Sequence, residues 1–284
     1  MMKTGLVLEG GAMRGMFTAG VIDVLMENEI WFDGAIGVSA GATFGCNYKS
    51  KQIGRPLRYC KRFAKDPRFC SFTSLFLTGD IFGVKFCYED IPDRLDPIDQ
   101  KTYEENPMPF SVVATECVTG KPVYVNLKSC RGESIKWMQA SASMPMVSKT
   151  VKIGDKEYLD GGISDSIPLR FMEDEGYTKN VVVRTQPVDY VKKPAAGMGF
   201  AKVSLRKYPG MIRALERRHR MYNKEVAYIN EAEKNGSAFV IAPPEELPVG
   251  RIEHDPEKLQ AAYDIGRKVM TEKLEALKAF LNRA

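Results

Sequence analysis

The chain has 284 residues and a mass of 31.8 kDa, and 44% of its residues are hydrophobic, so it can bury the core of one large α/β domain. It has two histidines and six cysteines without any C-x-x-C pair, which argues against a metal site, and we expect no metal and no cofactor. The net charge is +5, and no apolar run resembles a secretory signal or a membrane span, so we expect a cytoplasmic protein with reduced thiols and no nucleic-acid partner.

The chain begins with a pattern of strand, glycine-rich loop and helix. An apolar strand at 6–8 leads into the loop 9–15, and a helix with one apolar face follows from Met16 to about Glu29. Loop amides at a helix N-terminus suit a dinucleotide pyrophosphate, but Ala12 replaces the third glycine of that fingerprint and no acidic residue ends a second strand at the expected distance. The same amides suit a developing oxyanion, and a candidate nucleophile on the next strand favours this second interpretation.

That nucleophile is Ser39, in the G-x-S-x-G pentapeptide 37–41. An apolar strand at 35–38 precedes it, and small residues able to begin a helix follow it. A strand, a sharp turn and a helix make the serine project from the tip of the turn, and Gly37 and Gly41 remove side chains that would collide there. By itself the pentapeptide is a common chance match, but this context favours a nucleophile.

Residues 53–99 mix basic and aromatic side chains, with several breaks at proline and glycine. Such a segment is usually part of a core. A cap over the site that receives an acyl chain is the alternative, and the sequence leaves both open.

The next predicted elements lead to a candidate base. Asp160-Gly161-Gly162 lies at a strand end, which makes Asp160 a candidate base for Ser39, although such a tripeptide is most often only a turn. From residue 109 onward we expect strands at 109–115 and 123–127, a helix at 133–142, strands at 151–153 and 157–159, a helix at 168–175, a strand at 180–185, helical stretches at 211–215 and 221–232, a strand at 237–242 and a helix at 256–281.

Strands that alternate with helices predict an α/β fold of three layers, in which helices cover both faces of a mainly parallel central sheet. We expect a single domain over 1–284. Its core motifs lie in 5–168, and the part 169–284 completes the fold.

The C-terminal part carries a basic segment. Residues 192–224 hold ten Lys or Arg against one acid, Glu216, a local excess of +9. This charge makes the segment a candidate for peripheral contact with an anionic membrane, and a solvated helix face is the alternative.

These motifs together resemble the patatin-like phospholipase family. Residues 9–15 match its glycine-rich oxyanion loop, 37–41 its nucleophile elbow and 160–162 its catalytic aspartate motif, while 141–145 (SASMP) are similar to its segment before that aspartate. The resemblance covers about Gly5 to Pro168 and is less specific beyond.

The resemblance implies a lipid acyl-ester hydrolase, of phospholipase A or lysophospholipase type, that uses a Ser39–Asp160 dyad, an acyl-enzyme and no histidine. Its substrate would be a lipid or another acyl ester. The oxyanion would be held by amides of the loop from Gly10 to Gly15, with Ala40 as a further donor. The residues that it assigns to the oxyanion hole are Gly10, Gly11 and Ala12, and those that support the motifs are Arg14, Gly15, Gly37, Gly41, Gly161 and Gly162.

Two residues depart from the family pattern. Ala12 stands where glycine is usual, and an alanine can offer its amide to an oxyanion if its φ is negative. Glu9 stands where aspartate is common. For Arg14 we expect an ion pair that holds the loop against the body of the protein, rather than a direct part in catalysis.

Two other functions are left open. One is an α/β-hydrolase esterase with a Ser39–Asp160–His254 triad, although His254 lies in a predicted helix entry and His219 is expected on an exposed helix surface. The other is a non-catalytic lipid- or nucleotide-binding module, which would need neither the serine nor the aspartate.

Overall fold

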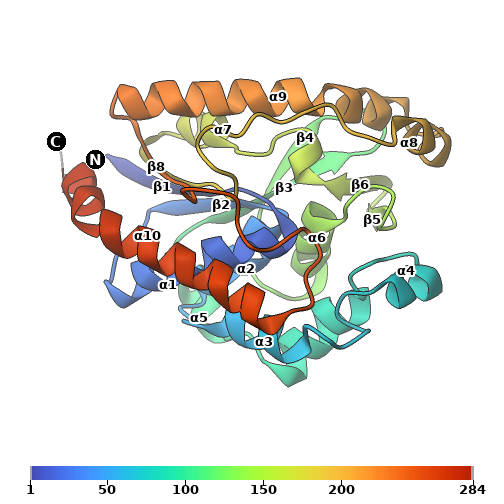
Figure 1. Ribbon diagram of the computed structural model, residues 1–284, viewed down its shortest axis with the longest axis horizontal. Helices are drawn as coiled ribbons and strands as arrows, with labels where there is room; N and C mark the ends of the chain where they lie inside the picture. Colours follow the sequence, from blue (N-terminus) through green and yellow to red (C-terminus); the bar gives the residue numbers. More distant parts are fainter. Residues whose placement is uncertain (1, 283–284) are drawn as a thin grey trace.

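The computed structural model describes residues 2–282 and has the expected three layers, with α9 and α7 above the sheet and α1, α2 and α10 below it in the view of Figure 1. The strands are β1 (Lys3–Leu8), β2 (Gly34–Val38), β3 (Phe110–Glu116), β4 (Pro122–Asn126), β5 (Val151–Ile153), β6 (Lys156–Asp160), β7 (Tyr177–Val183) and β8 (Ala238–Ile241). The α-helices are α1 (Gly15–Glu27), α2 (Ala40–Lys49), α3 (Arg55–Phe63), α4 (Phe72–Thr78), α5 (Gln100–Glu105), α6 (Gly132–Ala142), α7 (Leu169–Asp174), α8 (Met198–Ser204), α9 (Pro209–Lys234) and α10 (Pro256–Asn282).

The sheet is mainly parallel, as predicted. Its order is β5-β6-β3-β2-β1-β7-β8, with β4 also paired to β3. Four pairings are parallel, namely β1–β2, β1–β7, β2–β3 and β7–β8. The other three, β3–β4, β3–β6 and β5–β6, are antiparallel.

Successive side chains of the strands point to opposite faces of the sheet and contribute to a hydrophobic core on each face. Leu6 and Leu8 of β1 pack with α1 and α10, whereas Val7 packs with α9 on the other face. Both cores therefore take residues from the N-terminal and the C-terminal part of the chain. We infer from this shared burial that 2–282 form one domain.

Helices α1 and α10 cross at two glycines. A Cβ atom on Gly20 would lie 2.1 Å from the carbonyl oxygen of Tyr263, and one on Gly266 would lie 2.1 Å from that of Phe17. The two backbones thus touch where neither helix has a side chain.

One predicted element differs from the structure. The two helical stretches expected at 211–215 and 221–232 are a single helix, α9, which continues through the charged residues between them. Its apolar positions, among them Leu215, Tyr222 and Val226, keep one helical phase along its length, so one face packs on the sheet throughout.

Candidate active site

Ser39 lies at the tip of the turn between β2 and α2, as expected. Its φ of +55° and ψ of −118° are strained for a residue with a side chain, by about 1–3 kcal/mol. The Ser39 amide donates a 3.0 Å hydrogen bond to the hydroxyl of Ser141 on α6. The turn is therefore held in its strained shape by a contact from another helix.

The glycines on either side of Ser39 have the steric role predicted for them. A Cβ atom on Gly37 would lie 2.3 Å from the carbonyl oxygen of Gly41, and one on Gly41 would lie 2.2 Å from that of Leu8. Real Cβ contacts essentially never come under 3.0 Å, so the strand and helix pass too closely for any side chain.

Asp160 reaches Ser39 through the pairing of β3. Residues 111–113 of β3 pair with both β2 and β4, so these two strands lie on opposite edges of β3. Ala114 pairs with both Val123 of β4 and Asp160 of β6, so β6 lies on the same edge as β2. Val38 is paired with Val113 and Asp160 with Ala114, which brings the C-terminal ends of β2 and β6 together.

The Asp160 carboxylate is buried and hydrogen-bonded. It accepts a 2.8 Å hydrogen bond from the Gly162 amide, and the Ser39 hydroxyl lies close enough to lower its pKa. Burial raises the pKa of Asp160, while the charge of Arg218, the Ser39 hydroxyl and the Gly162 amide lower it in part. The net rise makes this carboxylate a stronger base than an exposed aspartate.

The backbone around Asp160 is fixed as well. The Thr115 hydroxyl donates to the Asp160 carbonyl oxygen at 2.8 Å, and the Asp160 amide donates to the Ser143 carbonyl oxygen at 2.8 Å. A Cβ atom on Gly161 would lie 2.1 Å from the carbonyl oxygen of Val113, so this glycine lets the turn pass over β3.

The glycine-rich loop lies beside Ser39. A Cβ atom on Gly10 would lie 2.8 Å from that of Ser39, and one on Gly15 would lie 2.8 Å from that of Ala40. Among residues 2–282, the amides of Gly10, Gly11, Ala12 and Ala40 have no hydrogen-bond acceptor. These four N–H groups are therefore available to a bound oxyanion.

The condition of a negative φ at Ala12 is not met. Its φ is +50°, in the left-handed region, where a Cβ atom costs about 1–2 kcal/mol. This explains why the family prefers glycine at the position. The Ala12 amide nonetheless lacks an acceptor, as a donor to an oxyanion must.

The expected ion pair of Arg14 is absent within residues 2–282, and Glu9 holds the loop instead. The Glu9 carboxylate accepts from the Thr185 amide at 2.6 Å and from the Tyr222 hydroxyl at 2.7 Å. Glutamate, which is longer than aspartate, here connects the loop to β7 and to α9.

Within residues 2–282, neither histidine is hydrogen-bonded to Ser39 or Asp160. Nδ1 of His254 lies 2.9 Å from the carbonyl oxygen of Ala64, directly after α3. His219 was expected on an exposed surface, which is wrong, because it is half-buried and its Nδ1 is buried without a partner. It follows Leu215 by four residues and precedes Tyr222 by three, and therefore falls on the buried face of α9.

The same helical phase brings in a residue that the sequence interpretation missed. Arg218 donates through Nε to the Gly162 carbonyl oxygen at 2.6 Å, beside Asp160. The basic character of 192–224 suggested a solvated face, but the spacing of Leu215, Arg218 and Tyr222 at i, i+3 and i+7 is the signal that places Arg218 inward.

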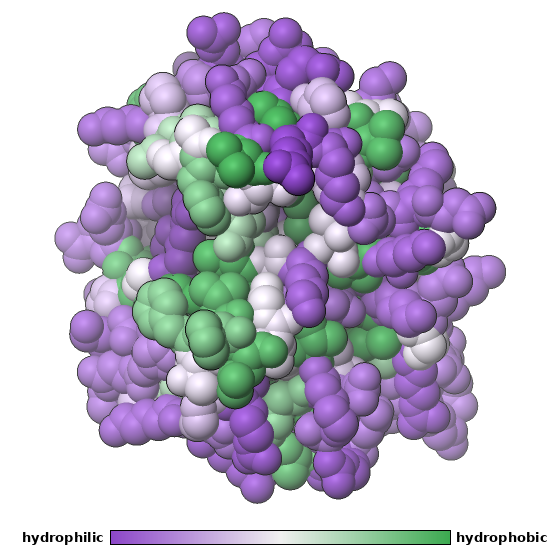
Figure 2. All heavy atoms as spheres, turned by 90° about the vertical axis from the view of Figure 1, so that its right-hand side faces the viewer, coloured by the Kyte–Doolittle hydropathy of each residue, from purple (hydrophilic) through white to green (hydrophobic). Residues whose placement is uncertain are grey.

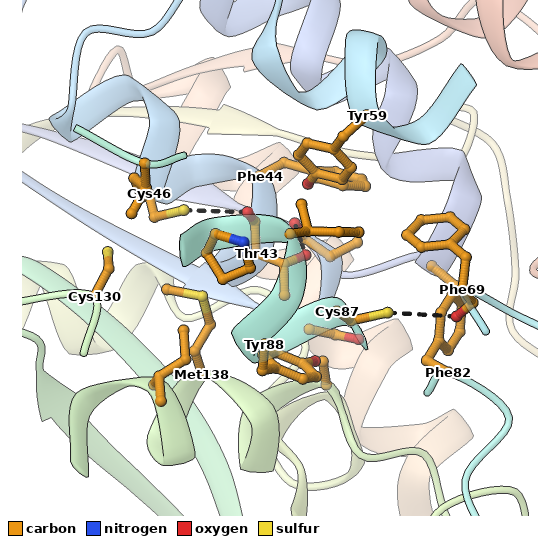
Figure 3. A pocket seen from close by; sticks show the side chains of 18 of the residues that line it. Thr43, Phe44, Cys46, Tyr59, Phe69, Phe82, Cys87, Tyr88, Cys130 and Met138 are labelled. Atoms are coloured by element: carbon orange, nitrogen blue, oxygen red, sulfur yellow. Dashed lines mark hydrogen bonds between the residues drawn. The ribbon is translucent and has the colours of Figure 1, made fainter. Parts of the chain in front are cut away.

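A largely apolar pocket opens beside Ser39. Its cavity has a volume of about 110 Å³ and is lined mainly by aromatic and aliphatic side chains. Figure 3 shows Tyr59, Phe69 and Phe82 on one side and Cys130 and Met138 on the other. Residues 53–99 therefore contribute both to a core cluster and to the pocket wall.

Comparisons with known proteins identify the family of the chain. The sequence model of the family described as patatin-like phospholipase matches residues 6–172, and one described as a domain of unknown function matches 208–282. The chain is 28% identical over 200 residues to the uncharacterized protein YjjU of Escherichia coli, an alignment that covers 65% of this chain and 52% of that protein. It is 25% identical over 167 residues to an uncharacterized NTE family protein of Mycobacterium tuberculosis, covering 59% and 44%.

The chain thus spans about half the length of the curated relatives it matches. Among solved structures, VipD from Legionella pneumophila aligns with 97% of this chain and 67% of its own, at a TM-score of 0.49 and 12% identity. The patatin-like match covers more than half of the residues and contains both Ser39 and Asp160. The chain belongs to the patatin-like phospholipase family.

Proposed function

We propose that the protein hydrolyses acyl esters of lipids, with Ser39 as the nucleophile and Asp160 as its base. The observation that carries the proposal is that Ser39 lies both in the wall of an apolar pocket and beside a buried carboxylate, Asp160, whose pKa it lowers. The membership in a family of phospholipases supports the same class of substrate.

In the acylation step, the Ser39 hydroxyl oxygen attacks the ester carbonyl carbon while Asp160 takes the hydroxyl proton. The amides of Gly10, Gly11 and Ala12, with Ala40, stabilise the oxyanion of the tetrahedral intermediate. The intermediate collapses, the ester C–O bond breaks, and Asp160 gives the proton to the departing alcohol.

In the deacylation step, a water molecule attacks the acyl-enzyme as Asp160 accepts its proton. The second tetrahedral intermediate then releases the fatty acid, and Asp160 returns the proton to Ser39. The acyl chain occupies the apolar pocket, whose aromatic and aliphatic walls exclude water.

Hydrolysis of p-nitrophenyl esters of two to sixteen carbons tests this proposal. We expect kcat/KM to rise about fourfold with each methylene that the pocket buries between acetate and octanoate, because each buried methylene contributes about 0.8 kcal/mol, and to be unchanged by a chelator. Ala142→Phe, which narrows the pocket, should reduce this chain-length preference. Equal rates for all chain lengths in both proteins would contradict an acyl site in the pocket.

We further propose peripheral contact with an anionic membrane through 192–224 and the exposed apolar side chains of α4. Phe200 and Val203 of α8 are 64% and 67% exposed, and Phe72 and Phe76 of α4 are 74% and 89% exposed. Figure 2 shows hydrophobic atoms gathered on the face that carries α4 and α8. Exposed apolar side chains beside cations are the usual composition of an interfacial surface. Within residues 2–282, no helix has the length and hydropathy to cross a bilayer.

Co-sedimentation with liposomes tests the membrane contact. We expect binding to grow when anionic lipid is added and to fall at high salt, because each contacting cation adds about 1 kcal/mol. Phe76→Ser with Phe200→Ser should weaken binding under all conditions, whereas Ile53→Ser, an exposed residue in the turn before α3, should not. Binding that is equal with and without anionic lipid and at both salt concentrations would contradict the proposal.

A further inference from the structure

Helix α9 contacts the site from outside the region that matches the patatin-like family. That match ends at residue 172, whereas α9 belongs to 208–282, which matches a domain of unknown function. Three polar side chains of α9, at positions 218, 222 and 225, bind to loops of the patatin-like region. Their spacing of i, i+4 and i+7 places them on one face of the helix.

Arg218 is bound to the turn that follows the proposed base, Asp160. Its Nε donates to the Gly162 carbonyl oxygen at 2.6 Å, while the Gly162 amide donates to the Asp160 carboxylate at 2.8 Å. A Cβ atom on Gly162 would lie 3.1 Å from Oδ1 of Asp160 and 3.3 Å from Nη2 of Arg218. The carboxylate and the guanidinium therefore both lie beside Gly162, and the two peptide groups of that residue connect them.

Tyr222 is bound to the other half of the site, the glycine-rich loop. Its hydroxyl donates to Oε1 of Glu9 at 2.7 Å, and the Thr185 amide donates to Oε2 at 2.6 Å. Glu9 directly precedes Gly10, the first residue assigned to the oxyanion hole. Tyr222 is 1% exposed, so its hydroxyl depends on this partner. A buried hydrogen bond thus ties the start of the oxyanion loop to α9.

Glu225 is bound to the segment that leads away from Asp160. Its carboxylate oxygens accept from the Ser166 amide at 3.2 and 3.3 Å, and the Ser166 hydroxyl donates to the Gly162 carbonyl oxygen at 2.8 Å. The Gly162 carbonyl oxygen therefore accepts from both Arg218 and Ser166, and α9 positions both donors.

These three polar groups interrupt a face that otherwise packs through apolar side chains such as Leu215, Val226 and Ile229. Burying a polar group is unfavourable unless it is hydrogen-bonded, so a helix that only covered the sheet would carry apolar residues at these positions too. The partners of the three groups lie in the loops that carry Asp160 and the oxyanion donors, which indicates a role in the site.

The charge of Arg218 also acts on Asp160. Burial raises the pKa of Asp160, and among the effects that lower this pKa the charge of Arg218 is the largest. Arg218 therefore favours the ionised carboxylate, the form that can accept the Ser39 proton. Two further groups near Asp160 are Arg251, before α10, and Tyr88, within 86–95. The other charged groups that face Arg218 are Glu9, Glu225 and Lys192.

We infer that α9 is part of the active site: Arg218 positions Asp160 through Gly162 and supplies a positive charge beside it, and Tyr222 positions the oxyanion loop through Glu9. The inference rests on the proposed hydrolase function and assigns a role to the segment 208–282. Both side chains act through another residue, so they are positioning residues. Point substitutions test them better than deletion of the segment, because α9 also supplies core side chains.

The first experiment measures kcat/KM for p-nitrophenyl octanoate from pH 6 to pH 9. Arg218→Gln removes a positive charge and so raises the pKa of Asp160, and we expect its loss of kcat/KM to be about tenfold greater at pH 6 than at pH 9. Arg218→Met, which is also neutral, should behave in the same way. Arg218→Lys keeps the charge and should keep the pH dependence of the wild type. Lys234→Gln removes an exposed cation from the same helix and should change neither value.

Tyr222→Phe tests the contact with the loop. We expect kcat to fall about tenfold, by the same factor at every pH and with KM unchanged, because the oxyanion donors lose a support while the charges near Asp160 stay in place. Tyr228→Phe is the matched control. It removes a hydroxyl of the same helix that is bound to Glu173 of α7, and it should retain full activity.

A third measurement needs no turnover. Carboxyl ¹³C NMR of protein labelled at aspartate, with Asp160→Asn to assign the signal, follows the titration of Asp160 directly. In Arg218→Gln this titration should move to higher pH than in the wild type. If the wild type cleaves no ester, the hydrolase proposal fails, and this titration still decides whether Arg218 acts on Asp160.

Two outcomes would overturn the inference. One is a folded Arg218→Gln protein that loses the same activity at pH 6 and pH 9 and in which Asp160 titrates as in the wild type, since Arg218 would then only stabilise the fold. The other is a Tyr222→Phe protein as active as Tyr228→Phe, which would show that the oxyanion loop does not depend on α9.

Discussion

Asp160→Asn is expected to lower turnover by about 10³- to 10⁴-fold while leaving the fold intact, as loss of the acidic partner does in serine hydrolases. Asparagine has nearly the same shape and can still accept the hydrogen bond from the Gly162 amide, but it cannot take the Ser39 proton. The measurement is kcat for p-nitrophenyl octanoate, with circular dichroism to verify the fold.

Companion variants separate a dyad from a triad. Ser39→Ala should abolish both hydrolysis and labelling by an organophosphonate. His219→Ala and His254→Ala should each retain the wild-type rate within about tenfold, because within residues 2–282 neither ring is hydrogen-bonded to Ser39 or Asp160. A folded His254→Ala protein as inactive as Ser39→Ala would establish a Ser-Asp-His triad instead.

The hydrolysis rate of the wild type should depend on pH through the ionisation of Asp160. Asp160 accepts a proton only when ionised, so the rate should fall as the pH drops through its pKa. Since burial raises that pKa in the folded protein, the fall should begin at a higher pH than an exposed aspartate would give.

Gly266→Ala is expected to destabilise the protein by about 2–3 kcal/mol. Helix propensity alone would predict the opposite, because it favours alanine over glycine by about 1 kcal/mol. The added Cβ atom would lie 2.1 Å from the carbonyl oxygen of Phe17, so α10 must move away from α1. Chemical denaturation monitored by circular dichroism measures the change in the free energy of unfolding.

Gly199→Ala is the matched control for this substitution. Gly199 lies in α8, and its added Cβ atom would meet nothing within 4 Å, so the protein should be unchanged or slightly more stable. If Gly266→Ala were as well tolerated as Gly199→Ala, the two helices would not be in backbone contact in solution.

The sequence was sufficient to predict the fold class and the turn around Ser39. The turn is predictable because its requirements are local. Ser39 adopts a positive φ between a strand and a helix whose backbones are in contact, so only glycine fits at positions 37 and 41. The strands and helices follow from hydrophobic periodicity in the same way.

Other features depend on contacts between distant segments. The register that pairs Asp160 with Ala114 joins residues 46 positions apart, and no local pattern encodes it. The loop is also held from a distant segment, by the hydrogen bond from the Thr185 hydroxyl to the Gly10 carbonyl oxygen, and alanine alone would avoid the positive φ that Ala12 adopts there. For Arg218, local charge suggested exposure, and the helical phase of its apolar neighbours was the better guide.

Because β2 and β6 share one edge of β3, the positions at which the chain tolerates insertions and deletions are restricted. Consecutive residues of β3 fix where the two strands end, so the separation of Ser39 and Asp160 is set by backbone geometry, at about 3.3 Å per residue. The connection between β3 and β6 runs through β4, α6 and β5, and it can lengthen or shorten without changing that separation. A single insertion between Val113 and Ala114 would alter it, so tolerance of insertions should change abruptly at this point of the sheet.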